Sequence, residues 1–143
     1  MVLVVCSFYD DESDEKKAAR NYEKLIVEDK VDAVLGPYGS AITEAVADVV
    51  ERHRMIMIAP TAGSTSMWER GRRYLVMMLS PVESLPEGLL DVAARNGLKR
   101  VALIKLDGLV ANAAVKGCVS TRLTLSLPFD DQFTDLRSWS PSA

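Results

Sequence analysis

The chain of 143 residues is poor in the residues that bind metals and form crosslinks, with only two cysteines and one histidine. Cys6 and Cys118 cannot form a network of disulfides, and a single histidine leaves too few ligands for a typical zinc site. The net charge of −3 provides no basic surface for a nucleic acid. The composition therefore excludes a zinc protein and a nucleic-acid binder, and it suggests no other metal or cofactor.

Long apolar segments are also missing, since no run approaches the roughly 18 residues that a membrane-spanning helix needs. Met1 leads directly into the apolar residues 2–5, without the basic stretch or the longer apolar stretch of a secretion signal. We therefore expect a cytoplasmic location if the chain is made as written. What remains is 48% hydrophobic and 26% charged residues, which is ordinary for one globular domain with its own core.

Short apolar segments alternate with segments of helical periodicity along the chain. The expected strands occupy residues 2–8, 31–35, 55–59, 74–79 and 101–106. The expected helices run from Asp11 or Ser13 to about Glu28, from Ser40 to Arg54, from Pro86 to residues 96–97, and onward from near Val110. Strands that alternate with helices imply crossover connections, so the predicted fold class is α/β, a parallel sheet with flanking helices.

The regular pattern ends after about Gly117. Residues 122–127 alternate between apolar and polar side chains, as in a half-exposed strand, and residues 129–143 are mostly polar. We therefore interpret residues 118–143 as an atypical tail that is either disordered or read out of frame.

Two loops that follow consecutive strands have the composition of a ligand site. In open α/β sheets, ligands bind at the carboxyl ends of the strands, beside helix N-termini. Residues 36–40 combine two glycines with Ser40 at the start of a helix, where free N–H groups and the helix dipole attract a carboxylate. The second loop adds the hydroxyls of Thr61, Ser64, Thr65 and Ser66. Turns and helix caps explain each loop about as well, but the two together predict a binding site.

The acidic residues 10–14 have two interpretations. One is a magnesium pocket, as in phosphoacceptor receiver domains, and the other is a set of first-turn residues favoured by the dipole of the following helix. A receiver also needs an aspartate at the end of the strand that here ends at Leu35 and Gly36, and the sequence has none there. We therefore prefer the second interpretation and predict no metal site.

No group of residues assembles a catalytic site. His53 is the only histidine, and its place in the last turn of a helix suggests a structural role. Residues 69–73 look like a solvated surface, and the methionines at 55, 57, 77 and 78 look like core residues. The sequence has neither a Walker phosphate-binding loop nor a G-x-G-x-x-G motif, so we predict that the protein is not an enzyme.

Four segments, in order, resemble the branched-chain amino acid binding proteins, which are type I periplasmic binding proteins of ABC importers. They are residues 9–14 (YDDESD), 31–40 (VDAVLGPYGS), 58–62 (IAPTA) and 68–74 (WERGRRY). The resemblance extends from residue 1 to about residue 117. It implies two α/β lobes joined by a hinge, which close on an amino acid, an amide or a similar small solute in the periplasm and deliver it to a membrane permease.

The resemblance assigns the ligand site to the same two loops. The predicted ligand-binding residues are Tyr38, Gly39, Ser40, Thr61, Ala62, Gly63 and Ser64. It implies that the first loop binds a ligand carboxylate through the serine hydroxyl and the backbone. The second loop would contact both the carboxylate and the ammonium group, and Gly63 stands where leucine-binding members usually have a threonine.

The resemblance also divides the chain. Residues 1–81 match part of the first lobe, residues 82–117 match the start of the second lobe, and residues 118–143 match neither. Parts of the family fold are missing, including a strand that would lie between the first two strands here. We therefore expect a fragment, or an out-of-frame ending after about Gly117, with weak or absent ligand binding. Unpaired strand edges predict self-association.

Two other functions stay open at this point. A receiver-like signalling domain is supported only by Asp10 and Asp11, Thr61 and Lys105, which follow successive strands. A ligand-sensing fragment of a transcription regulator would share the lobe fold, but it would need a DNA-binding segment that the sequence lacks.

Overall fold

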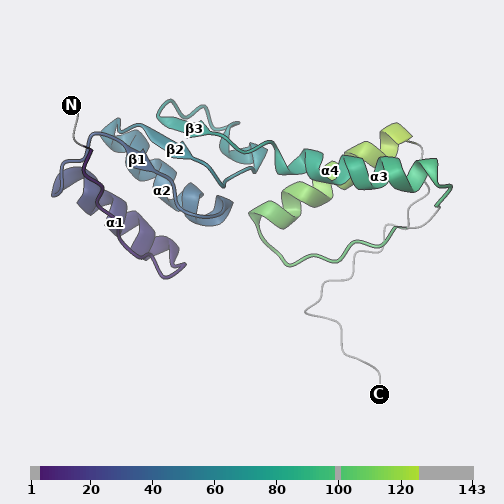
Figure 1. Cartoon of the computed structure of the whole chain (residues 1–143), viewed down its shortest axis with the longest axis horizontal. Coiled ribbons are helices and arrows are strands. Elements are labelled where there is room, and N and C mark those ends of the chain that lie inside the picture. Colours follow the sequence, from purple (N-terminus) through teal and green to yellow (C-terminus); the bar gives the residue numbers. More distant parts are fainter. Residues whose placement is uncertain (1–3, 99–100, 126–143) are drawn as a thin grey trace, which may run out of the picture. The chain divides into compact units, whose positions relative to one another are not determined.

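The computed structural model describes residues 4–98 and 101–125, which form two compact units (Figure 1). The first unit contains the described residues up to Ala62 together with Met67–Leu79. The second unit contains Gly63–Ser66 and the described residues from Ser80 onward. The chain therefore passes between the units after Ala62, after Ser66 and after Leu79.

The first unit is a parallel sheet with helices against it (Figure 1). Its elements are α1 (Glu15–Val27), β1 (Val34–Leu35), α2 (Ser40–His53), β2 (Met57–Ala59) and β3 (Leu75–Met77). Within the described residues, the strand order is β1-β2-β3, and both pairings are parallel. The predicted α/β class is confirmed.

Local sequence signals set the ends of the two helices. The side chain of Asp14 caps α1 by accepting a hydrogen bond of 2.6 Å from the backbone N–H of Lys17, so the expected caps Asp11 and Ser13 are wrong. The side chains of Asp10 and Asp11 instead accept from the N–H groups of Glu12 and Ser13, in the turns that precede the helix. The helix α2 ends at His53, and the next residue, Arg54, adopts the left-handed conformation with φ of 55°.

One face of the sheet is buried against both helices. Met57 in the central strand β2 is fully buried and packs with Val34 of β1. The helices contribute Ala18, Tyr22, Val46, Ala47, Val49 and Val50 to this core. The Tyr22 hydroxyl also donates a hydrogen bond to the carbonyl oxygen of Leu35, which fastens α1 to the end of β1.

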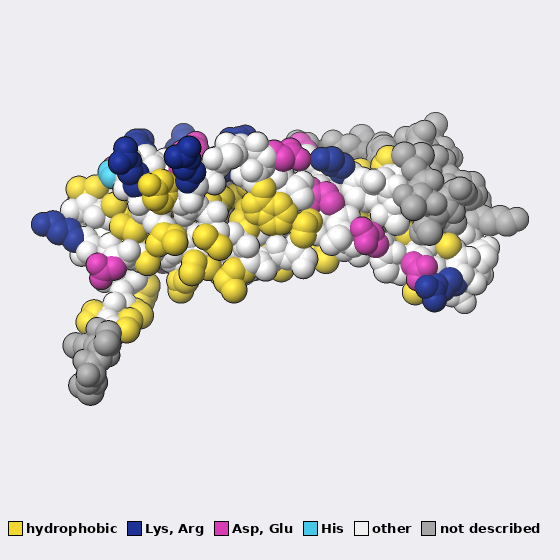
Figure 2. Space-filling model, turned by 90° about the horizontal axis from the view of Figure 1, so that it is seen from above, with side chains coloured by type: hydrophobic (Ala, Val, Ile, Leu, Met, Phe, Trp, Pro, Cys, Tyr) yellow, Lys and Arg dark blue, Asp and Glu magenta, His cyan; other side chains and the backbone are white. Residues whose placement is uncertain are grey.

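The other face of the sheet is apolar and exposed. Leu35, Ile58 and Val76 occupy one row across the three strands, and the side chain of Leu35 is 71% exposed. Met78 is 70% exposed, so the prediction that it belongs to the core is wrong. The same prediction is confirmed for Met57, which is fully buried in the core. Hydrophobic side chains gather on the surface of this unit in Figure 2.

Two predicted strands are not formed. Residues 4–8 have no strand partner, and Val4 and Phe8 are exposed; residues 2–3 lie outside the described part of the chain. Residues 101–106 are also not a strand, and Ile104 and Leu106 are exposed. An apolar segment becomes a strand only when a neighbouring strand accepts its backbone hydrogen bonds, and no described strand pairs with either segment.

The second unit is built from helices. Its elements are the 3₁₀ turn η2 (Val82–Ser84), α3 (Leu85–Arg95) and α4 (Leu109–Leu125). Pro86 lies in the first turn of α3 and Asn96 follows its last turn, as predicted. The expected strand at residues 122–127 is wrong up to Leu125, since these residues continue α4, and residues 126–127 lie outside the described residues. Among the described helices, none has the length and apolarity to cross a membrane.

A short 3₁₀ turn, η1 (Thr65–Met67), follows the loop after β2. Met67 at its end is fully buried, together with Ala59 and Ala62, in a second small apolar cluster of the first unit.

Ion pairs connect α2 to its neighbours. His53 pairs with Glu23 of α1 at 2.7 Å, in keeping with the structural role inferred for it, and Arg52 pairs with the same carboxylate at 2.9 Å. The His53 hydrogen bond is the main cause of a lowered pKa at Glu23.

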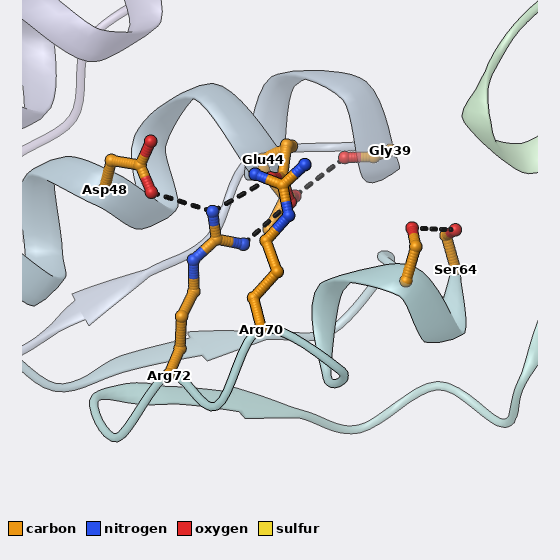
Figure 3. Close-up of polar contacts among 8 residues, drawn as sticks. Gly39, Glu44, Asp48, Ser64, Arg70 and Arg72 are labelled. Atoms are coloured by element: carbon orange, nitrogen blue, oxygen red, sulfur yellow. Dashed lines mark hydrogen bonds and ion pairs between the residues drawn. The ribbon is translucent and has the colours of Figure 1, made fainter.

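The segment at residues 69–73 is not a merely solvated surface. The side chain of Arg72 is only 6% exposed; its Nη1 and Nη2 donate to both oxygens of Glu44 at 2.7 and 2.9 Å, and Nη2 also contacts Asp48 at 2.8 Å (Figure 3). The Glu44 hydrogen bonds are the main reason that the pKa of Arg72 is raised. Arg70 also pairs with Glu44, but its side chain is 60% exposed.

The difference in burial between the two arginines predicts a difference in stability. We expect Arg72→Met to lower the free energy of unfolding by about 2–3 kcal/mol, because it removes the buried cation that donates two hydrogen bonds to the largely enclosed carboxylate of Glu44. Arg70→Met is the matched control and should cost less than about 1 kcal/mol, since exposed ion pairs contribute little. Urea unfolding followed by circular dichroism measures both, and equal losses would contradict the assignment.

Burial of Tyr22 predicts a loss of stability in alkali. Burial, with a smaller effect from Asp11, raises the pKa of Tyr22 from its ordinary 10.0 to about 12. The folded state therefore keeps the phenol proton longer than the unfolded state does. The free energy of unfolding therefore keeps its full value below pH 10. It falls as the pH rises through 12, by about 2–3 kcal/mol in total.

The variant Tyr22→Phe isolates this effect. At pH 7 it should be about 1 kcal/mol less stable than the unmodified chain, because the hydrogen bond to Leu35 is lost. Between pH 10 and 12 this deficit should shrink and reverse, since phenylalanine has no proton to lose. Urea unfolding at a series of pH values tests this, and a deficit that stays constant up to pH 12 would rule it out.

Candidate functional site

The loop between β1 and α2 is shaped by two glycines. The N–H of Gly36 donates to the Ile58 carbonyl oxygen at 2.7 Å, and a Cβ at this position would lie 3.0 Å from the Cα of Ala59. Only glycine allows this approach without a shift of the backbone. Gly39, immediately before α2, has φ of 84°, a conformation that other residues rarely adopt.

The structure brings the two predicted loops together through one hydroxyl. Thr61 Oγ1 accepts a hydrogen bond from the N–H of Gly39 at 3.2 Å and donates one to the Pro37 carbonyl oxygen at 3.0 Å. The loop after β2 is thereby fastened to the loop after β1. Because the Thr61 hydroxyl and the Gly39 N–H are hydrogen-bonded to each other, this pair holds the two loops in position.

Thr43 completes the same loop and was not singled out from the sequence. Its Oγ1 donates to the Gly39 carbonyl oxygen at 2.7 Å, as drawn in Figure 3, and lies 3.4 Å from the Pro37 carbonyl oxygen. The side chain is fully buried. The available signal was a threonine four residues after a loop glycine, a spacing at which a helical hydroxyl bonds back to the preceding turn.

The N-terminus of α2 is open to an anion. No side chain caps it, and its first turn contains no acidic residue. The first N–H groups of a helix have no partner within the helix, and the helix dipole adds a partial positive charge. Ala41, in this first turn, is exposed. This end of α2 can therefore accept a carboxylate in hydrogen bonds from the backbone.

The seven predicted site residues fall into the two units. Tyr38, Gly39, Ser40, Thr61 and Ala62 belong to the first unit, while Gly63 and Ser64 belong to the second. Tyr38 is 84% exposed at the loop surface, whereas Ser40 and Ala62 are buried. Their roles toward a ligand stay a prediction.

The two residues in the second unit are held by contacts of their own. The Gly63 carbonyl oxygen accepts from the N–H of Val82 at 2.9 Å, and the Ser64 hydroxyl lies 3.0 Å from that of Ser66 (Figure 3). No group of three or more histidine, cysteine, aspartate or glutamate side chains that could hold a metal ion occurs in the part of the chain that the structure describes.

Comparison with known proteins identifies the family. The family model for periplasmic binding proteins matches residues 3–121. A crystal structure of a solute-binding protein of an ABC transporter from Rhodopseudomonas palustris BisB5 has a TM-score of 0.77 and 25% sequence identity, over 85% of this chain and 33% of that chain.

Two further solved structures share the fold at lower identity. An extracellular ligand-binding receptor from Rhodopseudomonas palustris HaA2 has a TM-score of 0.79 and 22% identity, over 94% of this chain and 38% of that one. A leucine-binding protein from Thermotoga maritima has a TM-score of 0.73 and 22% identity, over 88% of this chain and 36% of that one.

The chain thus spans between 33% and 38% of the length of these structures. The family model, in contrast, covers most of the chain and includes both loops of the candidate site. The chain belongs to the periplasmic binding protein family.

Proposed function

We propose that this chain is part of the solute-binding component of an ABC-type importer, and that it binds a small carboxylate-bearing solute without catalysis. The branched-chain amino acids are the first candidates. The observation that carries the proposal is the uncapped N-terminus of α2, next to the loop that Thr61 and Thr43 hold in place. Family membership supports it.

The names of the related structures point to the same ligand chemistry. One is a leucine-binding protein, one is a branched-chain amino acid binding protein in complex with isoleucine, and others hold 3,4-dihydroxybenzoic acid or 4-hydroxybenzoate. These solutes differ in their side groups but share a carboxylate. A carboxylate is one of the anions that an open helix N-terminus can bind through its backbone N–H groups.

The partner and the location follow from the same proposal. A solute-binding component of an importer works in the periplasm, where it passes its solute to a membrane permease. This role needs neither a metal ion nor a catalytic group, because binding and release require only hydrogen bonds and shape.

Binding by this chain alone should be weak. The N-terminus of α2 offers a few backbone hydrogen bonds, and each one to a charged group contributes about 1.5–3 kcal/mol. Two of them amount to about 3–6 kcal/mol, close to the roughly 4 kcal/mol of a millimolar complex. We therefore expect dissociation constants in the millimolar range.

A titration followed by NMR tests the proposal. We expect the backbone amides of Ala41 and Ile42 to shift and saturate with millimolar leucine, isoleucine or 4-hydroxybenzoate. Leucinol, which lacks the carboxylate, should leave them unchanged. Ala41→Glu should weaken binding several-fold, because its carboxylate competes for the same helix end, while the neutral Ala41→Gln should not. Equal shifts with leucine and leucinol would refute the proposed carboxylate site.

We also propose that copies of this chain associate through the open apolar face of the sheet and its unpaired edges. The outer edges of β1 and β3 have no partner strand within the described residues. The row formed by Leu35, Ile58 and Val76 presents an apolar surface without a charged side chain. Such faces and edges promote association.

Sedimentation velocity tests this association. The unmodified chain should increase in average mass with concentration, and Leu35→Lys should shift it toward the monomer by placing a charge on the apolar face. The control is Val27→Lys, which changes an exposed apolar residue at the end of α1 and should leave the association unchanged. A monomer at all concentrations of the unmodified chain would overturn the idea.

A further inference from the structure

The carboxylate of Glu83 in the second unit is bonded to a residue far away in the sequence. Its Oε1 accepts hydrogen bonds from the hydroxyl of Thr65 at 2.5 Å and from the Thr65 backbone N–H at 3.3 Å. Thr65 is the first residue of η1, whereas Glu83 lies in η2, 18 residues further along the chain. The Glu83 carboxylate therefore accepts hydrogen bonds from both donor groups of Thr65, its hydroxyl and its backbone N–H.

The backbone around Glu83 is fixed from a second direction. A Cβ at Gly117 in α4 would lie 1.8 Å from the Glu83 carbonyl oxygen, so α4 crosses η2 in direct backbone contact and only glycine fits at that point. Next to Glu83, the N–H of Val82 donates to the Gly63 carbonyl oxygen at 2.9 Å. Thus η2 is packed against α4 on one side and bonded to residues 63–65 on another.

The surroundings keep Glu83 ionised. Burial opposes its charge, but the hydrogen bonds from Thr65 and the positive charge of Lys116 on α4 outweigh this and lower the pKa of Glu83. Its second oxygen, Oε2, is buried and has no hydrogen-bond partner among the described residues. An ionised carboxylate accepts stronger hydrogen bonds than a neutral group, so the contact with Thr65 is a strong one.

We propose that Glu83 is a positioning residue that holds the loop of residues 63–66 in the second unit through Thr65. The chain leaves the first unit after Ala62 and returns to it at Met67, yet residues 63–66 belong to the second unit. The bonds from Glu83 and Val82 tie this segment to η2.

The functional importance of this contact rests on the proposed function. Gly63 and Ser64 are predicted ligand-binding residues, and a loop held by Glu83 makes them part of the second unit, while Gly39 and Thr61 stay in the first. The positions of Gly63 and Ser64 within the second unit would then depend on Glu83.

Amide hydrogen exchange in the ligand-free full chain tests the proposal. In Glu83→Leu, which removes the acceptor, the amides of both Thr65 and Val82 should exchange at least about tenfold faster. Val82 is the critical reporter, because its N–H bonds Gly63 and not Glu83. Glu83→Gln keeps an acceptor oxygen and should restore slow exchange. The control is Glu87→Leu in the first turn of α3, which should change neither amide.

Two outcomes would overturn the proposal. If only the Thr65 amide accelerates, the loop does not depend on Glu83. If the amides throughout α3 and α4 accelerate as much, Glu83 has a general structural role and no specific one. Should Glu83→Leu not fold, Thr65→Val removes the donating hydroxyl and should accelerate both reporter amides by a smaller factor. The exchange measurement is made without a solute, so its result does not depend on the outcome of the solute titration that tests the proposed function.

Discussion

The central strand β2 is the element on which the first unit depends. It pairs in parallel with β1 and β3, and its residues Met57 and Ala59 are fully buried. Because the carboxyl ends of parallel strands lie at one edge of a sheet, the loops after β1 and β2 meet there. This is what allows Thr61 to bond Gly39 and Pro37. Loss of β2 would therefore remove the core and the candidate site together.

Polar contacts fix α2 from several sides. Its last turn is joined to α1 through His53 and Glu23, its middle to residues 69–73 through Arg72, and its first turn to the preceding loop through Thr43. The apolar core alone would resist sliding of the helix only weakly, since hydrophobic contacts are not directional. These directional bonds fix the direction in which its open N-terminus points, and the proposed site depends on that direction.

The loop after β2 divides its hydroxyls between the two units. Thr61 bonds the loop after β1, whereas Thr65 bonds Glu83 in the second unit. A run of small hydroxyl residues thus serves two structural purposes within a few positions.

Much of the helical structure and the fold class could be predicted from the sequence alone. Periodicity, Pro86 and the glycine before Ser40 are local signals, and the helices they mark begin and end within a few residues of the predicted positions. The meeting of the two loops also follows from the order of strands and helices. Only the tertiary structure decided that residues 4–8 and 101–106 are not strands, that Arg72 is buried, and that Glu83 holds Thr65. Helices close their hydrogen bonds within one turn, whereas a strand or a buried ion pair exists only if a residue far along the chain completes it.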